Sequence, residues 1–323
     1  MIKNKQKNIG CIGQGFVGSA VREKFKETFN IYAYDMDNMK QSISTDGKTE
    51  ITKTDINMLV KNCDVIFICV PTPMFEDGEC DISIVENVLD DVAKEADFQN
   101  KKIITIVKST VPPGTTERFN GISNNVGVIF SPEFLTELNA VNDFKNQNRI
   151  ILGIDYMEYV DPINEIFKKV FPNADIIIIN SKEAEMTKYT TNLFLATKVS
   201  FFNDIYSLCE KLGINYDNVI EATMYDPRIG KSHYMVPGPD GDRGFGGSCF
   251  PKDLSAILSI AMKLGLGLPT ITGANITNII VRKNKDWLEM EGRAIAKRKL
   301  LDTELREKFP ANVEGSEEFN NSK

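Results

Sequence analysis

The decapeptide from Gly244 to Asp253, GFGGSCFPKD, contains the residue types that covalent catalysis requires. Pro251 follows Cys249 by two positions, and proline fits the first turn of a helix because its missing N–H group has no intrahelical partner there. We therefore expect Cys249 to lie at a helix N-terminus, where the helix dipole and Lys252 favour a thiolate over a thiol. A thiolate at this position is a candidate nucleophile. The simpler alternative is a small buried thiol in a tight turn.

The histidine and cysteine content of the chain restricts its chemistry. The 323 residues include one histidine, His233, and six cysteines without a CxxC pair. One histidine excludes a multi-histidine metal site, and the cysteine spacing indicates neither a zinc site nor a disulfide framework, so we expect no metal. Acid–base chemistry is then expected from lysine, aspartate, glutamate and water. His233 is interpreted as a structural or loop residue.

Size and composition indicate a globular protein with room for two domains. The net charge of -7 and the pI of about 5.1 argue against general nucleic-acid binding. No apolar run approaches the roughly 18 residues of a membrane span, and the polar start of the chain lacks the apolar core of a signal peptide. We therefore expect a cytoplasmic protein with no nucleic-acid or membrane partner.

A nucleotide-binding pattern lies near the start of the chain. The apolar segment 8–12 leads into a GxGxxG pattern, and a second apolar segment, 31–34, ends at Asp35. Glycines at this point admit a pyrophosphate to the helix N-terminus, and a carboxylate after the second strand accepts the ribose hydroxyls. Asp35 would repel a 2′-phosphate, which favours NAD over NADP; Asp37 is the competing acid, and a tight turn without a cofactor is the alternative. The expected NAD contacts in this segment are Gly13, Gly15, Phe16, Val17, Gly18 and Asp35.

Further apolar segments predict an α/β fold with a doubly wound, Rossmann-type sheet. A helix is expected over 82–96, and strands are expected at 65–70, 102–107, 126–130, 150–154 and 174–179. Ligands of such sheets bind at the carboxyl ends of the strands. Two polar turns follow strands, one with Thr72 between two prolines and one with the sequence KSTVPPGT at 108–115. Both are expected to face the cofactor, and the alternative is ordinary turn residues and helix caps.

Two carboxylates follow the strand at 126–130. If a helical turn follows Pro132, Glu133 and Glu137 stand four residues apart on one face. Two neighbouring carboxylates are commonly a solvated surface. At the end of a Rossmann strand they are instead suited to be a general base and a cofactor contact.

A single long helix is expected from 181 to 212, a stretch without glycine or proline. Its length, on the order of 45 Å at about 1.5 Å per residue, exceeds what one small domain needs, so we expect it to bridge two domains and to carry a homodimer contact. The alternative for its apolar face is an ordinary intrachain core. Lys188 and Asn192 share one face of this helix. The expected apolar face comprises Phe194, Leu195, Val199, Phe202, Ile205 and Leu208.

These segments predict three regions. Residues 1–180 form an NAD-binding domain, and residues 181–292 form a mostly helical central domain for substrate binding and dimerisation. Within the central domain we expect a glycine- and proline-rich loop at 234–247 and helices at 251–264 and 275–291. The densely charged residues 293–323 are expected to be a flexible tail.

Several of these segments together resemble the UDP-glucose/GDP-mannose dehydrogenase family. The decapeptide fills every fixed position of the family pattern GFGGxCxPKD. Further family motifs are matched by KSTVPPGT, by SPEFLTE at 131–137, by Lys188 with Asn192, and by Arg-Ile-Gly at 228–230. The resemblance implies an NAD-dependent, four-electron oxidation of the C6 alcohol of a nucleotide sugar to the uronic acid, with UDP-glucose as the first expected substrate. Cys249 would attack the aldehyde, and the thiohemiacetal would be oxidised to a thioester and hydrolysed.

The resemblance also implies roles for individual residues. The expected catalytic residues are Cys249 as nucleophile, Lys188 and Asn192 for the oxyanion, Glu133 for acid–base work, and Asp253 with Thr110 for the water. Besides the glycine-rich segment and Asp35, the expected cofactor contacts are Lys40, Thr72, Thr110, Glu137 and Lys252. The expected substrate contacts are Glu133, Phe134, Leu135, Glu137, Lys188, Asn192, Arg228 from a partner subunit, Gly244, Phe245 and Gly246.

Full-length members of the family carry a third domain that closes over the nucleotide part of the substrate, and we expect this chain to lack it. Two alternative functions stay open at this point. One is a two-electron dehydrogenase of the 6-phosphogluconate or 3-hydroxy-acid type, which has no use for the cysteine. The other is a non-catalytic NAD-binding subunit.

Overall fold

A computed structural model of the chain describes residues 7–136 and 139–282. The chain forms two compact units, which divide inside helix α7 (Ser181–Leu212). Unit 1 comprises residues up to 73 and residues 80–191, and unit 2 comprises residues 74–79 and the chain from 192 onward. The sequence had suggested a domain boundary at the start of this helix; the tail expected at 293–323 lies outside the described residues. None of the helices in the described ranges is long and apolar enough to cross a membrane.

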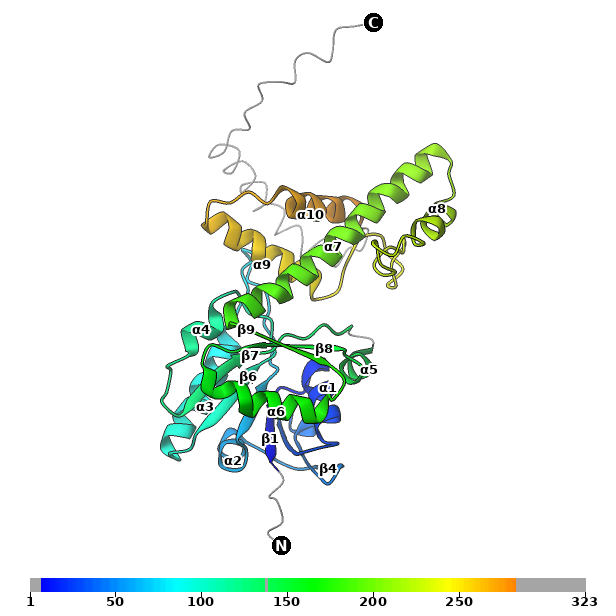
Figure 1. The fold of residues 1–323 in the computed structure, drawn as a ribbon. Helices are drawn as coiled ribbons and strands as arrows, with labels where there is room; N and C mark the ends of the chain where they lie inside the picture. The colour runs from blue at the N-terminus through cyan, green and yellow to red at the C-terminus, as the bar shows by residue number, and fades with distance from the viewer. Residues whose placement is uncertain (1–6, 137–138, 283–323) are drawn as a thin grey trace, which may run out of the picture. The chain divides into compact units, whose positions relative to one another are not determined.

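Unit 1 contains one sheet, in which the described residues contribute nine strands (Figure 1). In spatial order these are β4 (Lys48–Ile51), β3 (Ser42–Thr45), β2 (Asn30–Tyr34), β1 (Asn8–Ile12), β5 (Val65–Ile68), β6 (Ile103–Val107), β7 (Val126–Phe130), β8 (Arg149–Gly153) and β9 (Asp175–Ile179). Five neighbouring strands are parallel to one another: β2, β1, β5, β6 and β7. Strands β3 and β4 add an antiparallel hairpin at one side of these five. On the other side, β8 runs antiparallel to β7 and parallel to β9. The predicted doubly wound α/β fold is confirmed.

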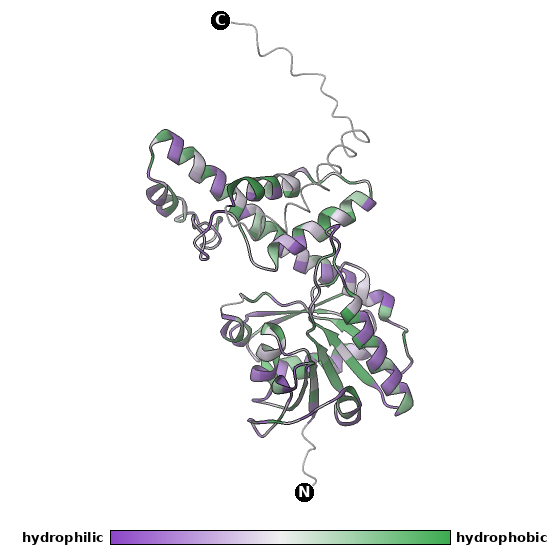
Figure 2. Ribbon diagram, turned by 180° about the vertical axis from the view of Figure 1, so that it is seen from behind, coloured by the Kyte–Doolittle hydropathy of each residue, from purple (hydrophilic) through white to green (hydrophobic). Residues whose placement is uncertain are grey.

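Helices cover both faces of this sheet. Helices α1 (Phe16–Phe25), α5 (Ala140–Lys145) and α6 (Val160–Val170) pack on one face around the Phe25 and Phe167 rings. Helices α2 (Ile56–Asn62) and α3 (Ser83–Phe98) pack on the other face. Figure 2 shows the central strands coloured as hydrophobic along their length, as expected for parallel strands that are buried on both sides. This layering leaves the carboxyl ends of the strands as the place for a ligand.

The two outermost strands of the sheet differ in character. All side chains of β4 are exposed, and two of its residues, Lys48 and Glu50, are charged. β9 instead carries a run of isoleucines, of which Ile177 is 44% exposed and Ile178 is 38% exposed.

Unit 2 is helical in its described part. It contains the C-terminal part of α7 together with α8 (Tyr216–Thr223), α9 (Phe250–Lys263) and α10 (Pro269–Val281). No helix or strand forms between 224 and 249, which agrees with the predicted loop at 234–247. The prediction of α9 is confirmed within one residue. The last predicted helix begins six residues earlier than expected, at Pro269, and ends at Val281, where Arg282 takes an extended backbone conformation; the rest of the predicted stretch, 283–291, lies outside the described residues.

The bounds of α7 match the prediction, but its predicted apolar face does not behave as one surface. Phe202 is buried in a cluster with Cys209, Tyr216 and Ile220, whereas Phe194 and Leu208 are exposed. The predicted face combines residues from two sides of the helix: one side packs against Tyr216 and Ile220 of α8, and the side with Phe194 and Leu208 is exposed.

Candidate functional site

The glycine-rich turn after β1 is shaped by close packing of the backbone. A Cβ atom added at Gly13, which has a φ of +86°, would lie 2.5 Å from the carbonyl oxygen of Cys69, and one added at Gly18 would overlap the carbonyl oxygen of Gly13. A Cβ atom at Gly15 would meet no atom of the chain within 4 Å. Gly13 and Gly18 are therefore needed for packing, while Gly15 faces open space at the start of α1.

Asp35 lies beside this turn, as predicted. Its Oδ2 atom accepts a hydrogen bond from the Gln14 backbone N–H at 2.6 Å, and its Oδ1 atom accepts one from the Asp37 N–H at 2.9 Å. Each carboxylate oxygen has capacity for a second donor, such as a ribose hydroxyl. Asp37 instead caps a short 3₁₀ helix, Asn38–Lys40, by accepting from the Met39 N–H. Asp35 is thus the better placed of the two candidate acids.

A pocket of about 560 Å³ opens in front of the turn. The buried Oε1 atom of Gln14 has no hydrogen-bond partner among the described residues. Open space at Gly15, a helix N-terminus and the nearby lysine Lys40 fit the pyrophosphate of a dinucleotide. Phe16, which was expected to contact the cofactor, also lines this pocket; the full lining is Gln14, Gly15, Phe16, Ser19, Lys40 and residues 139–142.

Hydrogen bonds connect the turn at 108–115 to Val70, to Cys80 and to Glu185 of α7. The Ser109 hydroxyl donates to the Val70 carbonyl oxygen at 2.7 Å, and the Cys80 thiol donates to the Thr110 carbonyl oxygen at 3.7 Å. The Glu185 carboxylate of α7 accepts hydrogen bonds from the Gly114 N–H at 2.5 Å and the Thr116 N–H at 2.8 Å. Burial raises the pKa of Glu185, and these hydrogen bonds oppose that rise. Glu185 was not among the predicted site residues, because its depth cannot be read from the sequence.

Glu133 and Lys188, both predicted site residues, form a buried ion pair in unit 1. The Lys188 Nζ atom lies 3.0 Å from Glu133 Oε1 and donates to the Glu133 carbonyl oxygen at 2.6 Å. The Glu133 side chain is 11% exposed and the Lys188 side chain is 5% exposed. Burial by itself raises the pKa of Glu133, but the Lys188 charge and the hydrogen bond from the Leu135 N–H lower it, and the net pKa lies below the usual 4.5. Glu133 is therefore a carboxylate at neutral pH.

The helical turn considered after Pro132 does not form. Residues 131–136 have no helical structure, and Glu137, one of the predicted site residues, lies outside the described residues. The carbonyl groups that would begin a helix are already occupied, because Lys108 takes those of Ser131 and Pro132 and Lys188 takes that of Glu133. The Glu133 carboxylate also accepts from the backbone two residues on, which stabilises a turn instead of a helix.

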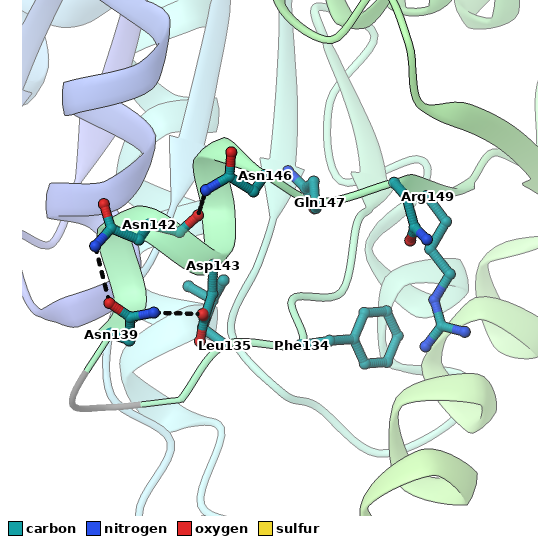
Figure 3. A pocket seen from close by; sticks show the side chains of 9 residues that line it. Phe134, Leu135, Asn139, Asn142, Asp143, Asn146, Gln147 and Arg149 are labelled. Carbon is teal, nitrogen blue, oxygen red and sulfur yellow. Dashed lines mark hydrogen bonds between the residues drawn. The ribbon is translucent and has the colours of Figure 1, made fainter. Parts of the chain in front are cut away.

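Phe134 and Leu135, predicted to contact the substrate, line a second pocket of about 470 Å³ (Figure 3). The Arg149 guanidinium carbon lies 4.6 Å from the centre of the Phe134 ring, a cation–π contact. The side chain of Asp143 accepts from the Thr136 and Asn139 side chains on the opposite wall. The remaining lining residues are amides, Asn142, Asn146, Gln147 and Asn148.

The predicted nucleophile lies where the sequence placed it within unit 2. Cys249 is exposed and immediately precedes α9, with Pro251 in the first turn. Asp253, whose exposure is 1%, accepts from the Asn192 Nδ2 atom at 2.6 Å and from the Lys252 Nζ atom at 2.6 Å. Its backbone N–H donates to the Cys249 carbonyl oxygen at 2.9 Å. Four predicted site residues therefore meet at the start of one helix. Lys252 forms an ion pair with the neighbouring carboxylate there.

Three side chains that the sequence did not reveal hold the glycine-rich loop before Cys249. The Gly244 N–H donates to Asn203 Oδ1 at 3.1 Å, and the Phe245 N–H donates to Asn278 Oδ1 at 2.7 Å. A Cβ atom at Gly246 would overlap the Arg282 guanidinium, which is buried and donates to Asp240 at 2.6 Å. Asn203 and Asn278 are polar residues inside helices, and Arg282 directly follows one. Their positions in the sequence do not show that their side chains face inward.

Arg228 and His233 lie apart from these hydrogen bonds. The Arg228 side chain is 87% exposed and is held by Asp226, so it is available to a second molecule. His233 has a φ of +58° and a ring 5.7 Å from that of Phe250. Burial, together with the Lys198 charge, lowers the pKa of His233, which keeps it neutral and agrees with a structural role.

Comparison with known proteins supports the dehydrogenase motifs. The model for the NAD binding domain of the UDP-glucose/GDP-mannose dehydrogenase family matches residues 20–171, and the model for the central domain of that family matches residues 182–279. UDP-glucose 6-dehydrogenase of Rickettsia bellii is 35% identical over 257 residues, which are 78% of this chain and 56% of that protein. An uncharacterized protein of Methanocaldococcus jannaschii is 32% identical over 91% of this chain and 34% of its own length.

Two solved structures share the fold. A UDP-glucose dehydrogenase from Pyrobaculum islandicum aligns with a TM-score of 0.75 at 28% identity, covering 86% of this chain and 69% of its own. A GDP-mannose dehydrogenase from Pseudomonas aeruginosa aligns with a TM-score of 0.61 at 27% identity, covering 84% and 68%. The chain thus spans a little over half the length of the Rickettsia bellii enzyme and about two thirds of these solved chains.

Proposed function

This chain belongs to the UDP-glucose/GDP-mannose dehydrogenase family, and we propose that it oxidises the C6 alcohol of a nucleotide sugar to a carboxylate with NAD. The observation that carries this proposal is the arrangement at the start of α9. An exposed cysteine at a helix N-terminus has a buried aspartate one turn behind it, and that aspartate is fixed by Asn192 and Lys252. A two-electron dehydrogenase needs no such thiol.

In this proposal, the resemblance to the family assigns a task to each predicted catalytic residue. Glu133 is a carboxylate and removes the proton of the sugar hydroxyl, while the Lys188 ammonium stabilises the developing alkoxide. The Cys249 thiolate adds to the aldehyde carbon, and the Asn192 amide donates to the oxyanion that forms. Asp253 and Thr110 orient the water that hydrolyses the thioester. Bound NAD would accept the hydride in each of the two oxidation steps.

The nucleotide sugar itself is the open part of the proposal. The similar proteins include dehydrogenases of UDP-glucose and GDP-mannose, and both sugars carry a primary alcohol at C6. Purified protein should be incubated with NAD and either UDP-glucose, GDP-mannose or a UDP-N-acetyl sugar while NADH absorbance is followed. Two NADH per sugar oxidised would support the proposal. One NADH per sugar would favour the two-electron alternative, and NAD binding without turnover would favour a non-catalytic subunit.

The glycine-rich turn gives a direct test of the cofactor site. Gly15→Ala is expected to leave the thermal stability unchanged and to weaken NAD binding at least about tenfold, because its methyl group enters the space in front of α1. Gly18→Ala serves as the contrasting variant, since its methyl group overlaps the Gly13 carbonyl and should lower the melting temperature. Isothermal titration calorimetry and thermal denaturation measure the two effects. Unchanged NAD affinity in Gly15→Ala would place the cofactor elsewhere.

We further propose that the chain forms a homodimer through α7. Phe194, Phe201 and Leu208 are exposed and recur every seven residues, so they form one apolar stripe along the helix. Phe201→Glu is expected to shift the protein from dimer to monomer in analytical ultracentrifugation, because a charge in the middle of an apolar contact is not solvated. Glu210→Lys, at an exposed position two residues after Leu208 and therefore on the other side of the helix, should leave the dimer intact. A monomeric wild-type protein would contradict this proposal.

A further inference from the structure

Lys108 is a buried cation that the proposed chemistry does not use. It follows β6 directly and is 3% exposed. Its Nζ atom donates to the Ser131 carbonyl oxygen at 2.8 Å, to the Ser131 hydroxyl at 3.2 Å and to the Pro132 carbonyl oxygen at 3.3 Å. All three donors of the ammonium group are thereby used on neutral oxygens. Those oxygens belong to the two residues that precede Glu133.

The groups around Lys108 come from several elements of unit 1. Cys11 of β1, Cys69 after β5, Glu133 after β7 and Lys188 of α7 are the titratable neighbours, and the Phe144 ring of α5 lies 5.6 Å from Nζ. Burial lowers the pKa of Lys108 to about 8, and the Lys188 charge adds to this effect while Glu133 opposes it. Burial also raises the pKa of Cys69 well above its ordinary value, so that thiol is neutral. Glu133 is thus the carboxylate whose charge Lys108 influences.

Burying an ammonium group that has no directly bonded carboxylate costs folding free energy, so holding a loop in place is a weak reason for such a residue. The same strand provides a comparison, because Lys101, just before β6, also donates to three backbone carbonyls, those of Val60, Lys61 and Cys63. Lys101 keeps 25% of its side chain exposed and lies at the amino end of the strand. The buried lysine is the one at the carboxyl end, next to Glu133.

We propose that Lys108 is a positioning residue for Glu133: it holds the Ser131–Pro132 segment so that the Glu133 carboxylate has a fixed direction, and its charge adds to that of Lys188 in favouring the ionised carboxylate. Two lysines therefore restrain Glu133: Lys108 bonds to the backbone that precedes it, and Lys188 bonds directly to its carboxylate. The proposal rests on the acid–base role given to Glu133 above.

The test compares Lys108→Met, Lys108→Arg and Lys101→Met in the full chain. Lys108→Met is expected to lower kcat on the order of tenfold to a hundredfold with little change in KM, because misdirected catalytic groups slow the chemical step. Removing a positive charge raises the pKa of Glu133, so the acid limb of the pH profile of kcat/KM should move to higher pH. Lys108→Arg retains the charge and should keep the acid limb at its wild-type position. Lys101→Met should leave the limb and kcat unchanged.

A second measurement does not depend on turnover. In protein labelled with carbon-13 at the glutamate carboxyl carbon, the Glu133 resonance, assigned with Glu133→Gln, is titrated by NMR. Its midpoint should rise in Lys108→Met and stay constant in Lys101→Met. An unchanged midpoint in Lys108→Met, or an equal rise in Lys101→Met, would overturn the positioning role. A wild-type protein that does not oxidise nucleotide sugars would contradict the proposed function instead, and the NMR result would still decide the role of Lys108.

Discussion

Replacing Cys249 with serine is expected to lower uronic-acid formation on the order of 10⁴-fold or more, because a serine hydroxyl is not ionised at neutral pH and the reaction loses its nucleophile. The position of Cys249 supports its role as the nucleophile. Cys249 is exposed at the start of α9, and the Asn192–Asp253–Lys252 hydrogen bonds lie directly behind it. The measurement is NADH production with the best sugar of the panel, together with detection of the carboxylate product by mass spectrometry.

Cys209→Ser is the matched control for this experiment. Cys209 is also in unit 2, but it is buried in the cluster around Phe202 and Tyr216 and has no part in the proposed reaction. We expect Cys209→Ser to retain the wild-type rate after correction for any loss of folded protein. A Cys249→Ser protein as active as the wild type would remove the covalent mechanism and leave a two-electron dehydrogenase as the better reading.

The second large effect is expected on stability, from Lys188→Met. This substitution leaves the buried Glu133 carboxylate without its direct partner, and breaking a buried pair from one side costs about 3–5 kcal/mol of unfolding free energy. Glu133→Gln in the same chain should restore part of this loss, since no uncompensated charge remains. Urea denaturation followed by circular dichroism measures both variants. Lys169→Met, which breaks the exposed pair with Glu165 on α6, should change the unfolding free energy very little.

The pH dependence of this effect has a defined sign. The pKa of Glu133 is lowered by folding, so its ion pair stabilises the protein above the ordinary carboxyl pKa of 4.5, and this stabilisation is lost as the pH falls below that value. The difference between wild type and Lys188→Met should therefore be largest at pH 7 and shrink toward pH 4. A difference that stays constant over this range would show that Lys188 acts through packing and not through the charge of Glu133.

The sequence was most informative where one local pattern decides the structure. The β1–α1–β2 unit has glycines at positions where a side chain would overlap the backbone, so its conformation can be read from residue types alone. Helix α7 was predicted with its observed bounds because 32 residues pass without glycine or proline. The β3–β4 hairpin was missed, although its Asp46-Gly47 pair, with φ values of 50° and 77°, is a common hairpin turn. Its short, polar strands have no apolar alternation to reveal them.

The parts of the site that the sequence did not reveal depend on tertiary packing. Lys108 stood within the predicted KSTVPPGT turn, but no pattern tells that its ammonium group is buried and directed at Ser131. Glu185 within α7 and Arg282 directly after α10 are charged residues, for which exposure is the usual expectation. Such buried residues hold the backbone next to the site in place, and they can be identified only when the packing of unit 1 or unit 2 is known.

The contrast between the two outermost strands has a consequence for handling the protein. The two exposed charged side chains of β4, those of Lys48 and Glu50, discourage a strand of another molecule from joining the sheet there. β9, with its exposed isoleucines, offers no such protection. During prolonged storage or mild heating we therefore expect amyloid-like aggregation to start at β9, and a lysine in place of Ile177 should delay it.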